Sequence, residues 1–237
     1  MIKGEEETRE KLALCARALG RIGAIGLGGH ITLRIPDSEL IVITPGGGLD
    51  KEKLTAADMV TMDADGKYVS GPYGPPLEWP IHTAVHRARP ELDSVAHLHA
   101  HWSTVFAISD RPMEPVLLSA ASRIGEHVPF FEIPSLVTTA DLGEQLKNAL
   151  GDAGAILMRW HGSTVVGRTI DEMFDRAWVI EENARLFWEA NAIGNIVPVP
   201  RGVTREAPGG AARTLNYYAN LERPAGYQRH QGSNPAG

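Results

Sequence analysis

The 237-residue sequence contains a single cysteine, no long apolar run and no excess of basic residues, and each absence excludes a class of protein. With Cys15 alone, one chain can form neither an internal disulfide nor a metal site built from several thiolates. No stretch of about 18 apolar residues is present to span a bilayer, and the charged N-terminus does not read as a secretory signal. We therefore expect a cytoplasmic protein that does not associate with membranes.

The charge balance and the histidine content narrow the remaining classes. Lysine and arginine together number 23 against 29 aspartates and glutamates, for a net charge of −6, so the chain lacks the basic surface that binds nucleic acids. Histidine, by contrast, occurs nine times. Many imidazoles with almost no thiol are typical of a metal site with nitrogen and oxygen ligands, or of acid–base chemistry.

Hydrophobic periodicity predicts helices alternating with strands along most of the chain. The expected helices cover residues 5–22, 78–89, 101–109, 139–150 and 169–191; the expected strands cover 31–35, 39–44, 93–100, 128–133, 155–159 and 163–167, with a further hairpin over 59–68. This alternation predicts one α/β domain over residues 1–197, and its hairpins indicate a sheet that is not purely parallel. Residues 198–237 are rich in proline and glycine, and we expect a tail that lies over the surface or over a neighbouring subunit.

The strongest chemical signal is His97-Leu98-His99 within a predicted strand. Side chains at positions i and i+2 of a strand project from the same face, so two imidazoles at this spacing can bind one metal ion. Two polar residues on a solvated strand face would give the same pattern. The apolar residues that lead into the pair favour the metal site.

Other histidines and one glutamate support either a functional or a structural interpretation. Glu78, His82 and His86 recur every four residues along a predicted helix, which suits a second metal site or a solvated helix face. Glu78 also follows a rigid proline turn, a position that fixes a carboxylate for proton transfer or ligation. His161 lies alone between two strands, where a buried structural histidine is the simpler interpretation.

Two glycine-rich loops and one arginine are candidates for binding an anion. The loops at 26–30 and 44–48 could cradle an anion with backbone N–H groups, or could simply form flexible hairpin turns. Arg123 could bind a carboxylate through its guanidinium fork, although a surface role is the alternative. Cys15 lies on the apolar face of the first helix and is expected to pack in the core.

Taken in order, these motifs resemble the class II aldolase/adducin family over roughly residues 8–195. The motifs that carry the resemblance are Gly29-His30-Ile31-Thr32 for the family's G-N-x-S, Thr44-Pro45-Gly46-Gly47 for T-P-S-G, Pro75-Pro76-Leu77-Glu78 for P-S-S-E, Val95-Ala96-His97-Leu98-His99 for V-V-H-x-H, and Trp160-His161-Gly162 for H-H-G. The resemblance implies a three-layer αβα sandwich with a mainly antiparallel central sheet, and a tetramer with sites between subunits.

The resemblance also assigns roles at the site. It implies that His97, His99 and His161 ligate one divalent metal per subunit, Zn²⁺ or Mn²⁺, with Fe²⁺ or Co²⁺ as alternatives. Glu78 becomes the acid–base residue or a fourth ligand. The substrate-binding residues would come from the two loops, from Arg123 and His101, and from tail tyrosines that replace the aldolases' catalytic tyrosine: His30, Thr44, Gly46, Arg123, His101, Tyr217 and Tyr218. His82 and His101 would support the site, whereas His86, His127 and His230 would lie at the surface.

The departures from the aldolase pattern favour a different reaction within the family. His30, Thr32, Gly46, Pro76 and Leu77 replace most of the phosphate donors of the sugar-phosphate aldolases. The pattern is more similar to the decarboxylase branch, so we expect a metal-dependent carboxy-lyase acting on a small, anionic, hydroxylated aromatic or ring-derived acid. A class II aldolase acting on a hydroxy-keto acid or a sugar phosphate is the alternative, and a non-catalytic adducin-like module is a third.

In the carboxy-lyase hypothesis each polar residue has a task. The metal would chelate a hydroxyl and the neighbouring carboxylate, while His30 and Arg123 would hold a second carboxylate. Glu78 would protonate the carbon that loses CO₂. Its half-buried position is expected to raise its pKa for that purpose.

Overall fold

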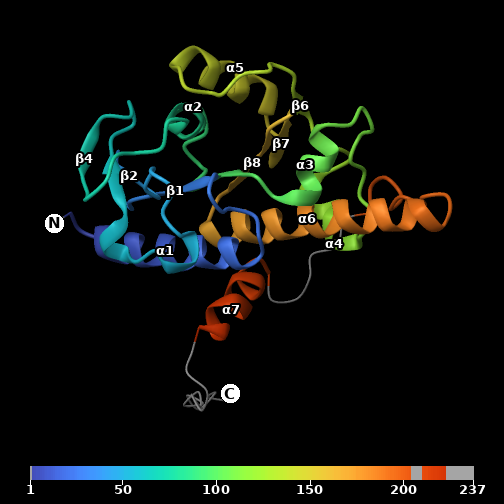
Figure 1. Cartoon of the computed structure of the whole chain (residues 1–237), viewed down its shortest axis with the longest axis horizontal. Helices are drawn as coiled ribbons and strands as arrows, with labels where there is room; N and C mark the ends of the chain where they lie inside the picture. Colours follow the sequence, from blue (N-terminus) through green and yellow to red (C-terminus); the bar gives the residue numbers. More distant parts are fainter. Residues whose placement is uncertain (1, 204–209, 223–237) are drawn as a thin grey trace.

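A single eight-stranded sheet organises the computed structural model, which describes residues 2–203 and 210–222 (Figure 1). The strand order is β4-β3-β2-β1-β5-β8-β7-β6. Every neighbouring pair of these described strands is antiparallel except β6 with β7. The strands are β1 (His30–Arg34), β2 (Ile41–Ile43), β3 (Val60–Met62), β4 (Tyr68–Ser70), β5 (Ser94–Leu98), β6 (Phe130–Phe131), β7 (Ala155–Met158) and β8 (Gly162–Gly167).

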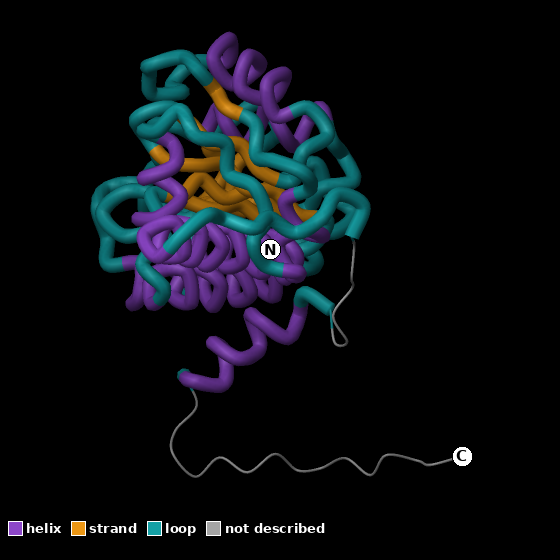
Figure 2. The backbone as a smooth tube through the Cα atoms, turned by 90° about the vertical axis from the view of Figure 1, so that its right-hand side faces the viewer, coloured by secondary structure: helices purple, strands orange, loops and turns teal. Residues whose placement is uncertain are grey.

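Helices cover both faces of this sheet and give the three layers. Helices α1 and α6 lie on one face, and α2 and α5 lie on the other (Figure 1). Figure 2 shows the strands enclosed between the helical layers. The described helices are α1 (Glu5–Arg21), α2 (Trp79–Ala88), α3 (His101–Ala107), α4 (Leu118–Ile124), α5 (Ala140–Leu150), α6 (Ile170–Ile193) and α7 (Ala212–Leu221), with short 3₁₀ turns at Lys51–Lys53 and Ala56–Asp58. The predicted αβα sandwich with a mainly antiparallel sheet is confirmed.

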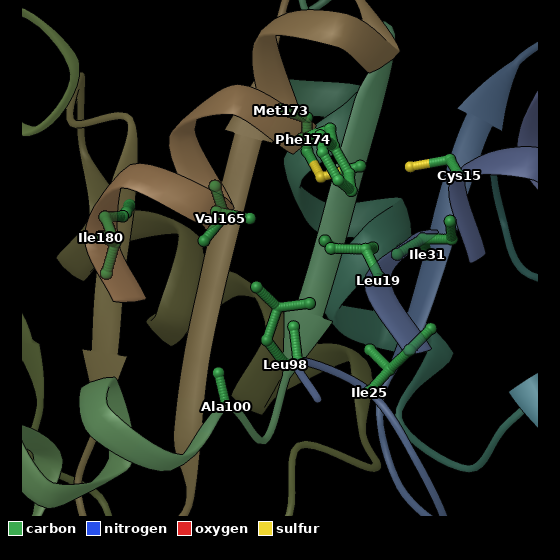
Figure 3. Packing of buried hydrophobic residues seen from close by; sticks show 14 of the residues in the cluster. Cys15, Leu19, Ile25, Ile31, Leu98, Ala100, Val165, Met173, Phe174 and Ile180 are labelled. Atoms are coloured by element: carbon green, nitrogen blue, oxygen red, sulfur yellow. The ribbon is translucent and has the colours of Figure 1, made fainter. Parts of the chain in front are cut away.

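Alternating side chains of the central strands supply two cores. In β5, Val95 packs toward α2 and α5, whereas the next residue, Ala96, packs toward α1 and α6. The larger core includes Leu19, Ile31 and Phe174, together with the fully buried Cys15 (Figure 3). By the same alternation, His30 and Thr32 of β1 and His97 of β5 project toward α2, the helix that directly follows Glu78. Polar side chains therefore meet between this face of the sheet and α2.

Two helices lie outside the elements expected from the sequence. Helix α4 is only seven residues long, which is too short for its apolar spacing to be distinguished from a loop. Helix α7 lies within the predicted tail, and it packs against the domain through the buried Leu215 and through a contact between Tyr218 and Phe174, whose ring centroids are 5.5 Å apart. The remainder of the predicted tail, at 204–209 and 223–237, lies outside the described residues.

No helix among the described residues combines the length and the apolar character needed to cross a membrane.

Candidate metal centre

Four side chains from three separate parts of the chain converge at one end of the central strands. Glu78 immediately precedes α2, His97 lies in β5, His99 follows that strand, and His161 lies between β7 and β8. One ligand atom from each of the four lies within 4.8 Å of the others. Nε2 of His99 is 2.9 Å from Nε2 of His97 and 3.2 Å from Nε2 of His161, and Oε2 of Glu78 is 3.5 Å from Nε2 of both His97 and His161. Three imidazoles and one carboxylate therefore point at a common centre.

Hydrogen bonds fix the orientation of two of these ligands. His97 Nδ1 donates to the carbonyl oxygen of Ser163 at 3.1 Å, which places the proton on Nδ1 and leaves the Nε2 lone pair for a metal. Glu78 Oε1 accepts from the backbone N–H of Val137 at 2.9 Å, so Oε2 is the oxygen that faces the histidines. Such support is typical of metal ligands.

Two glycines make room for the histidine rings. A Cβ on Gly28 would lie 2.4 Å from His99 Nδ1, and a Cβ on Gly162 would lie 2.2 Å from the carbonyl oxygen of Leu98. Trp160, directly before His161, has a φ of 56°, which is rare for a bulky residue and marks a tightly constrained turn. The glycine of the Trp160-His161-Gly162 motif is thus required by close packing.

The electrostatics of the cluster favour a bound cation. Burial alone would raise the pKa of Glu78, but its interactions with His97, with the Val137 N–H and with the nearby His161 outweigh burial and lower that pKa to about 2. The expectation of a raised pKa for Glu78 is therefore wrong. Its hydrogen bond and the neighbouring histidines stabilise the carboxylate by more than the loss of water destabilises it. Burial, followed by the neighbouring His97 and His161, lowers the pKa of His99 to about 4, and burial likewise lowers the pKa of His161.

Neutral imidazoles and an ionised carboxylate are the forms that bind a metal. The donor set of three nitrogens and one oxygen fits a divalent ion such as Zn²⁺, Mn²⁺, Fe²⁺ or Co²⁺.

The cluster opens into a cavity of about 390 Å³ that also contains a lysine the sequence analysis did not single out. The lining residues are Leu27, Gly28, Gly29, His30, Pro45, Gly46, Gly47, Gly48, Lys51, Pro75, Pro76, Leu77, Glu78, His99 and Leu136. Lys51 is the one lysine or arginine among these described residues. It is 4% exposed, and its Nζ donates to the carbonyl oxygen of Pro45 at 3.1 Å. Its position three residues after the 44–48 loop was the available signal.

The two loops reach the cavity as their sequence indicated, but only some of their predicted residues face it. His30 and Gly46 line the cavity. Thr44 is fully buried behind it, and its hydroxyl accepts a hydrogen bond from the backbone N–H of Ile31 at 3.1 Å.

The other predicted substrate contacts lie elsewhere in the described chain. Arg123 is in α4, where its Nε lies 2.7 Å from Asp175 Oδ2 of α6. His101 and Tyr218 line a separate cavity, and Tyr217 is exposed on α7. Within one chain these four residues do not reach the metal centre.

The remaining histidines divide differently from the expectation. His86 is 3% exposed, so its predicted surface position is wrong: its helix face is turned toward the sheet. His82 is fully buried on the same face, next to His30, and His127 is exposed as expected. His82 and His86 do not join the metal cluster. His230 lies outside the described residues.

Comparison with known proteins places this arrangement in a family. Residues 10–188 match the class II aldolase and adducin N-terminal domain. L-Fuculose phosphate aldolase of Escherichia coli O6:H1 is 30% identical over 174 residues, which cover 73% of this chain and 79% of the relative. A 3,4-dihydroxyphthalate decarboxylase of Arthrobacter keyseri is 28% identical over 197 residues, covering 78% of this chain and 79% of the relative.

A solved structure gives the same assignment of the fold. An aldolase II superfamily protein of Pseudomonas syringae superimposes with a TM-score of 0.80 at 24% identity, over 93% of this chain and 94% of the other. The extent of the family match, together with the aldolase relative, shows that the chain belongs to the class II aldolase and adducin family, whose members related to it include both aldolases and decarboxylases.

Proposed function

We propose that the protein is a metal-dependent decarboxylase of a hydroxylated aromatic or ring-derived acid carrying a second anionic group. The observation that carries this proposal is the composition of the cavity: the Glu78 and histidine cluster opens into a space with one buried cation, Lys51, and apolar walls from Leu27, Leu77 and Leu136. Apolar walls suit a ring, and a single ammonium suits a carboxylate. We assign the second anion to Lys51 in place of Arg123.

The hydroxyls of Thr32 and Thr44 are already engaged, which disfavours a phosphate in this cavity. The Thr32 hydroxyl contacts the rings of His82 and His86, and that of Thr44 accepts from a backbone N–H. Pro76 and Leu77, which line the cavity before Glu78, offer no side-chain donor. A phosphate has several oxygens that need donors, so this cavity is better matched to a carboxylate.

Each residue then has a task in the reaction. Held by His97, His99 and His161, a divalent ion would supply Lewis acidity that stabilises negative charge on a substrate oxygen, and Glu78 is left for proton transfer. Glu78, ionised in the free protein, takes the proton of the substrate hydroxyl and returns it to the ring carbon. The bond from that carbon to the carboxylate breaks, CO₂ leaves, and its bonding electrons remain in the ring. Lys51 holds the second carboxylate and orients the ring.

The direct test is CO₂ release from 3,4-dihydroxyphthalate, chosen because a decarboxylase relative is named for it. We expect release by the wild type, one divalent ion per chain in protein purified without chelator, and neither property in His97→Ala. Cleavage of L-fuculose 1-phosphate to an aldehyde without any CO₂ release would instead favour the aldolase alternative, which the 30% identical relative supports. Metal-free protein with neither activity would favour the adducin-like alternative.

Lys51 provides a second test of the substrate assignment. Lys51→Met should raise KM for the dicarboxylate about tenfold to a hundredfold, because a hydrogen bond to a charged group contributes about 1.5–3 kcal/mol. The value of kcat should change less, because this contact stabilises the bound substrate and the transition state equally. Lys53→Met is the matched control, since Lys53 is exposed and pairs with Asp50. An unchanged KM in Lys51→Met would remove Lys51 from the substrate site.

Assembly into a homotetramer with sites at subunit interfaces is also part of this proposal. Arg123, His101, Tyr217 and Tyr218 could contact substrate only if a neighbouring subunit brought them to the cavity, since they lie outside it in their own chain. Light scattering coupled to size-exclusion chromatography tests the assembly.

A further inference from the structure

A buried polar chain runs away from the metal centre between β1 and α2. His30 Nδ1 is 2.7 Å from His82 Nε2, and His82 Nδ1 is 2.9 Å from the Thr32 hydroxyl. The same hydroxyl is 2.9 Å from His86 Nε2, and His86 Nδ1 is 3.2 Å from the carbonyl oxygen of Leu92. Strand and helix thus alternate in one continuous series, His30–His82–Thr32–His86, which we name the His30 relay.

The relay lies within otherwise apolar packing. The exposed fraction is 6% for His30, 3% for His86 and 0% for both His82 and Thr32. Their neighbours Ile81, Val85 and Val95 belong to the hydrophobic core under α2. Burying a polar group without a hydrogen bond costs about 1–3 kcal/mol, so apolar residues would fill this space with less risk to stability. Each polar group of the relay finds its hydrogen-bonding partner in the next residue of the series, and of the four members only His30 lines the cavity.

The neighbours of the relay set the direction of its hydrogen bonds. The Thr32 hydroxyl donates its proton to the carbonyl oxygen of Val95 at 3.3 Å, so it can only accept from the two histidine rings. His86 Nε2 therefore donates to this hydroxyl, and His86 Nδ1 lies 3.2 Å from Arg34 Nη2, which can only donate. That hydroxyl accepts from His82 Nδ1, and His82 Nε2 in turn accepts from His30 Nδ1.

We infer that the His30 relay holds His30 as the tautomer with its proton on Nδ1, so that Nε2 offers a lone pair to the substrate cavity. His30 therefore accepts a hydrogen bond from a substrate hydroxyl rather than binding a carboxylate. Thr32, His82 and His86 act as positioning residues, and the anion is left to Lys51. This inference rests on the proposed function for the identity of the substrate, but the tautomer itself can be measured without turnover.

The test is the protonation of the His30 ring nitrogens in the full-length protein labelled with ¹⁵N-histidine. Two-dimensional NMR distinguishes protonated from unprotonated ring nitrogens, and His30→Asn identifies the His30 signals. We expect a protonated Nδ1 and an unprotonated Nε2 in the wild type, and a mixture of tautomers in Thr32→Val, which keeps the side-chain shape but removes the central hydroxyl. A protonated Nε2 in the wild type, or a spectrum unaffected by Thr32→Val, would overturn the inference.

Kinetics on 3,4-dihydroxyphthalate then tests whether the tautomer matters. We expect kcat/KM to fall about tenfold in Thr32→Val, as is typical for residues that orient a site from behind, and to recover to within about threefold in Thr32→Ser. Thr83→Val is the matched control, because Thr83 is an equally buried threonine of α2 whose hydroxyl bonds only within its helix. Unfolding temperatures confirm that all variants are folded.

The two measurements separate the possible failures. A tautomer that changes without any effect on kcat/KM would overturn the specificity role. Absence of turnover in every protein, wild type included, would count against the proposed function alone, since the NMR result still decides the relay.

Discussion

The buried His86 makes the protein sensitive to acid in a way that can be calculated. Burial, followed by the positive charge of Arg34, lowers the pKa of His86 from its ordinary value of 6.5 to about 3. Between these values the unfolded chain binds a proton that the folded protein does not, so a falling pH favours unfolding. The stability that depends on neutral His86 is fully present above pH 6.5 and is lost progressively toward pH 3.

The magnitude follows from the size of the shift. At pH 5.0 the medium is 1.5 units below the ordinary pKa of 6.5, and each unit corresponds to 1.36 kcal/mol, so His86 alone removes about 2 kcal/mol from the free energy of unfolding. Burial also lowers the pKa of His30 and His82, which adds further acid sensitivity.

A comparison with His86→Gln isolates this one residue. Urea unfolding, followed by the fluorescence of the five tryptophans, would be measured at pH 7.5 and pH 5.0 for both proteins. The variant should be less stable at pH 7.5, yet its loss of unfolding free energy on acidification should be smaller than that of the wild type by about 2 kcal/mol. Equal losses in the two proteins would refute the reasoning.

Two further predictions concern the packing around the metal centre. Gly28→Ala should lower the affinity for Zn²⁺ about tenfold or more, because the added Cβ would lie 2.4 Å from His99 Nδ1. Gly26→Ala is the control, since nothing lies within 4 Å of a Cβ at that position. Competition with a chromophoric chelator measures both affinities, and equal values would contradict the prediction. Glu181→Ala should lower the free energy of unfolding by about 1–2 kcal/mol. The reason is that the Glu181 carboxylate caps α3 by accepting hydrogen bonds from the backbone N–H groups of Trp102 and Ser103 at 2.6 and 2.9 Å. An unchanged denaturation midpoint would show that α3 does not need this cap.

The regular elements were predictable where their periodicity was long or strict. The helix expected at 5–22 is observed at 5–21, and that expected at 169–191 is observed at 170–193. Short elements were less accessible: β6 has only two residues, and the sequence suggested six. Helix α7 was missed because a single buried leucine carries little periodic signal within a proline- and glycine-rich segment.

The candidate site was predictable in part for a similar reason. His97 and His99 share a strand face by local geometry alone, which any strand enforces. His86 could not be placed, because a histidine on an amphipathic helix suits either a solvated face or a polar stripe, and only the packing of α2 on the sheet distinguishes them. Lys51 was overlooked because isolated lysines are almost always exposed.

The sequence by itself determined the alternation of helices and strands, the local spacing of the histidine pair and the absence of thiolate ligands, because all of these depend on residues close together in the chain. Only the tertiary structure decided which distant residues share a site. The neighbouring order β1-β5-β8 and the packing of α2 bring Glu78 and His161 to the histidine pair, place His30 beside His97, and leave Arg123 with Asp175. The physical reason is that side-chain direction within an element is a local property, whereas the neighbour that a side chain meets depends on how the whole sheet is ordered and covered.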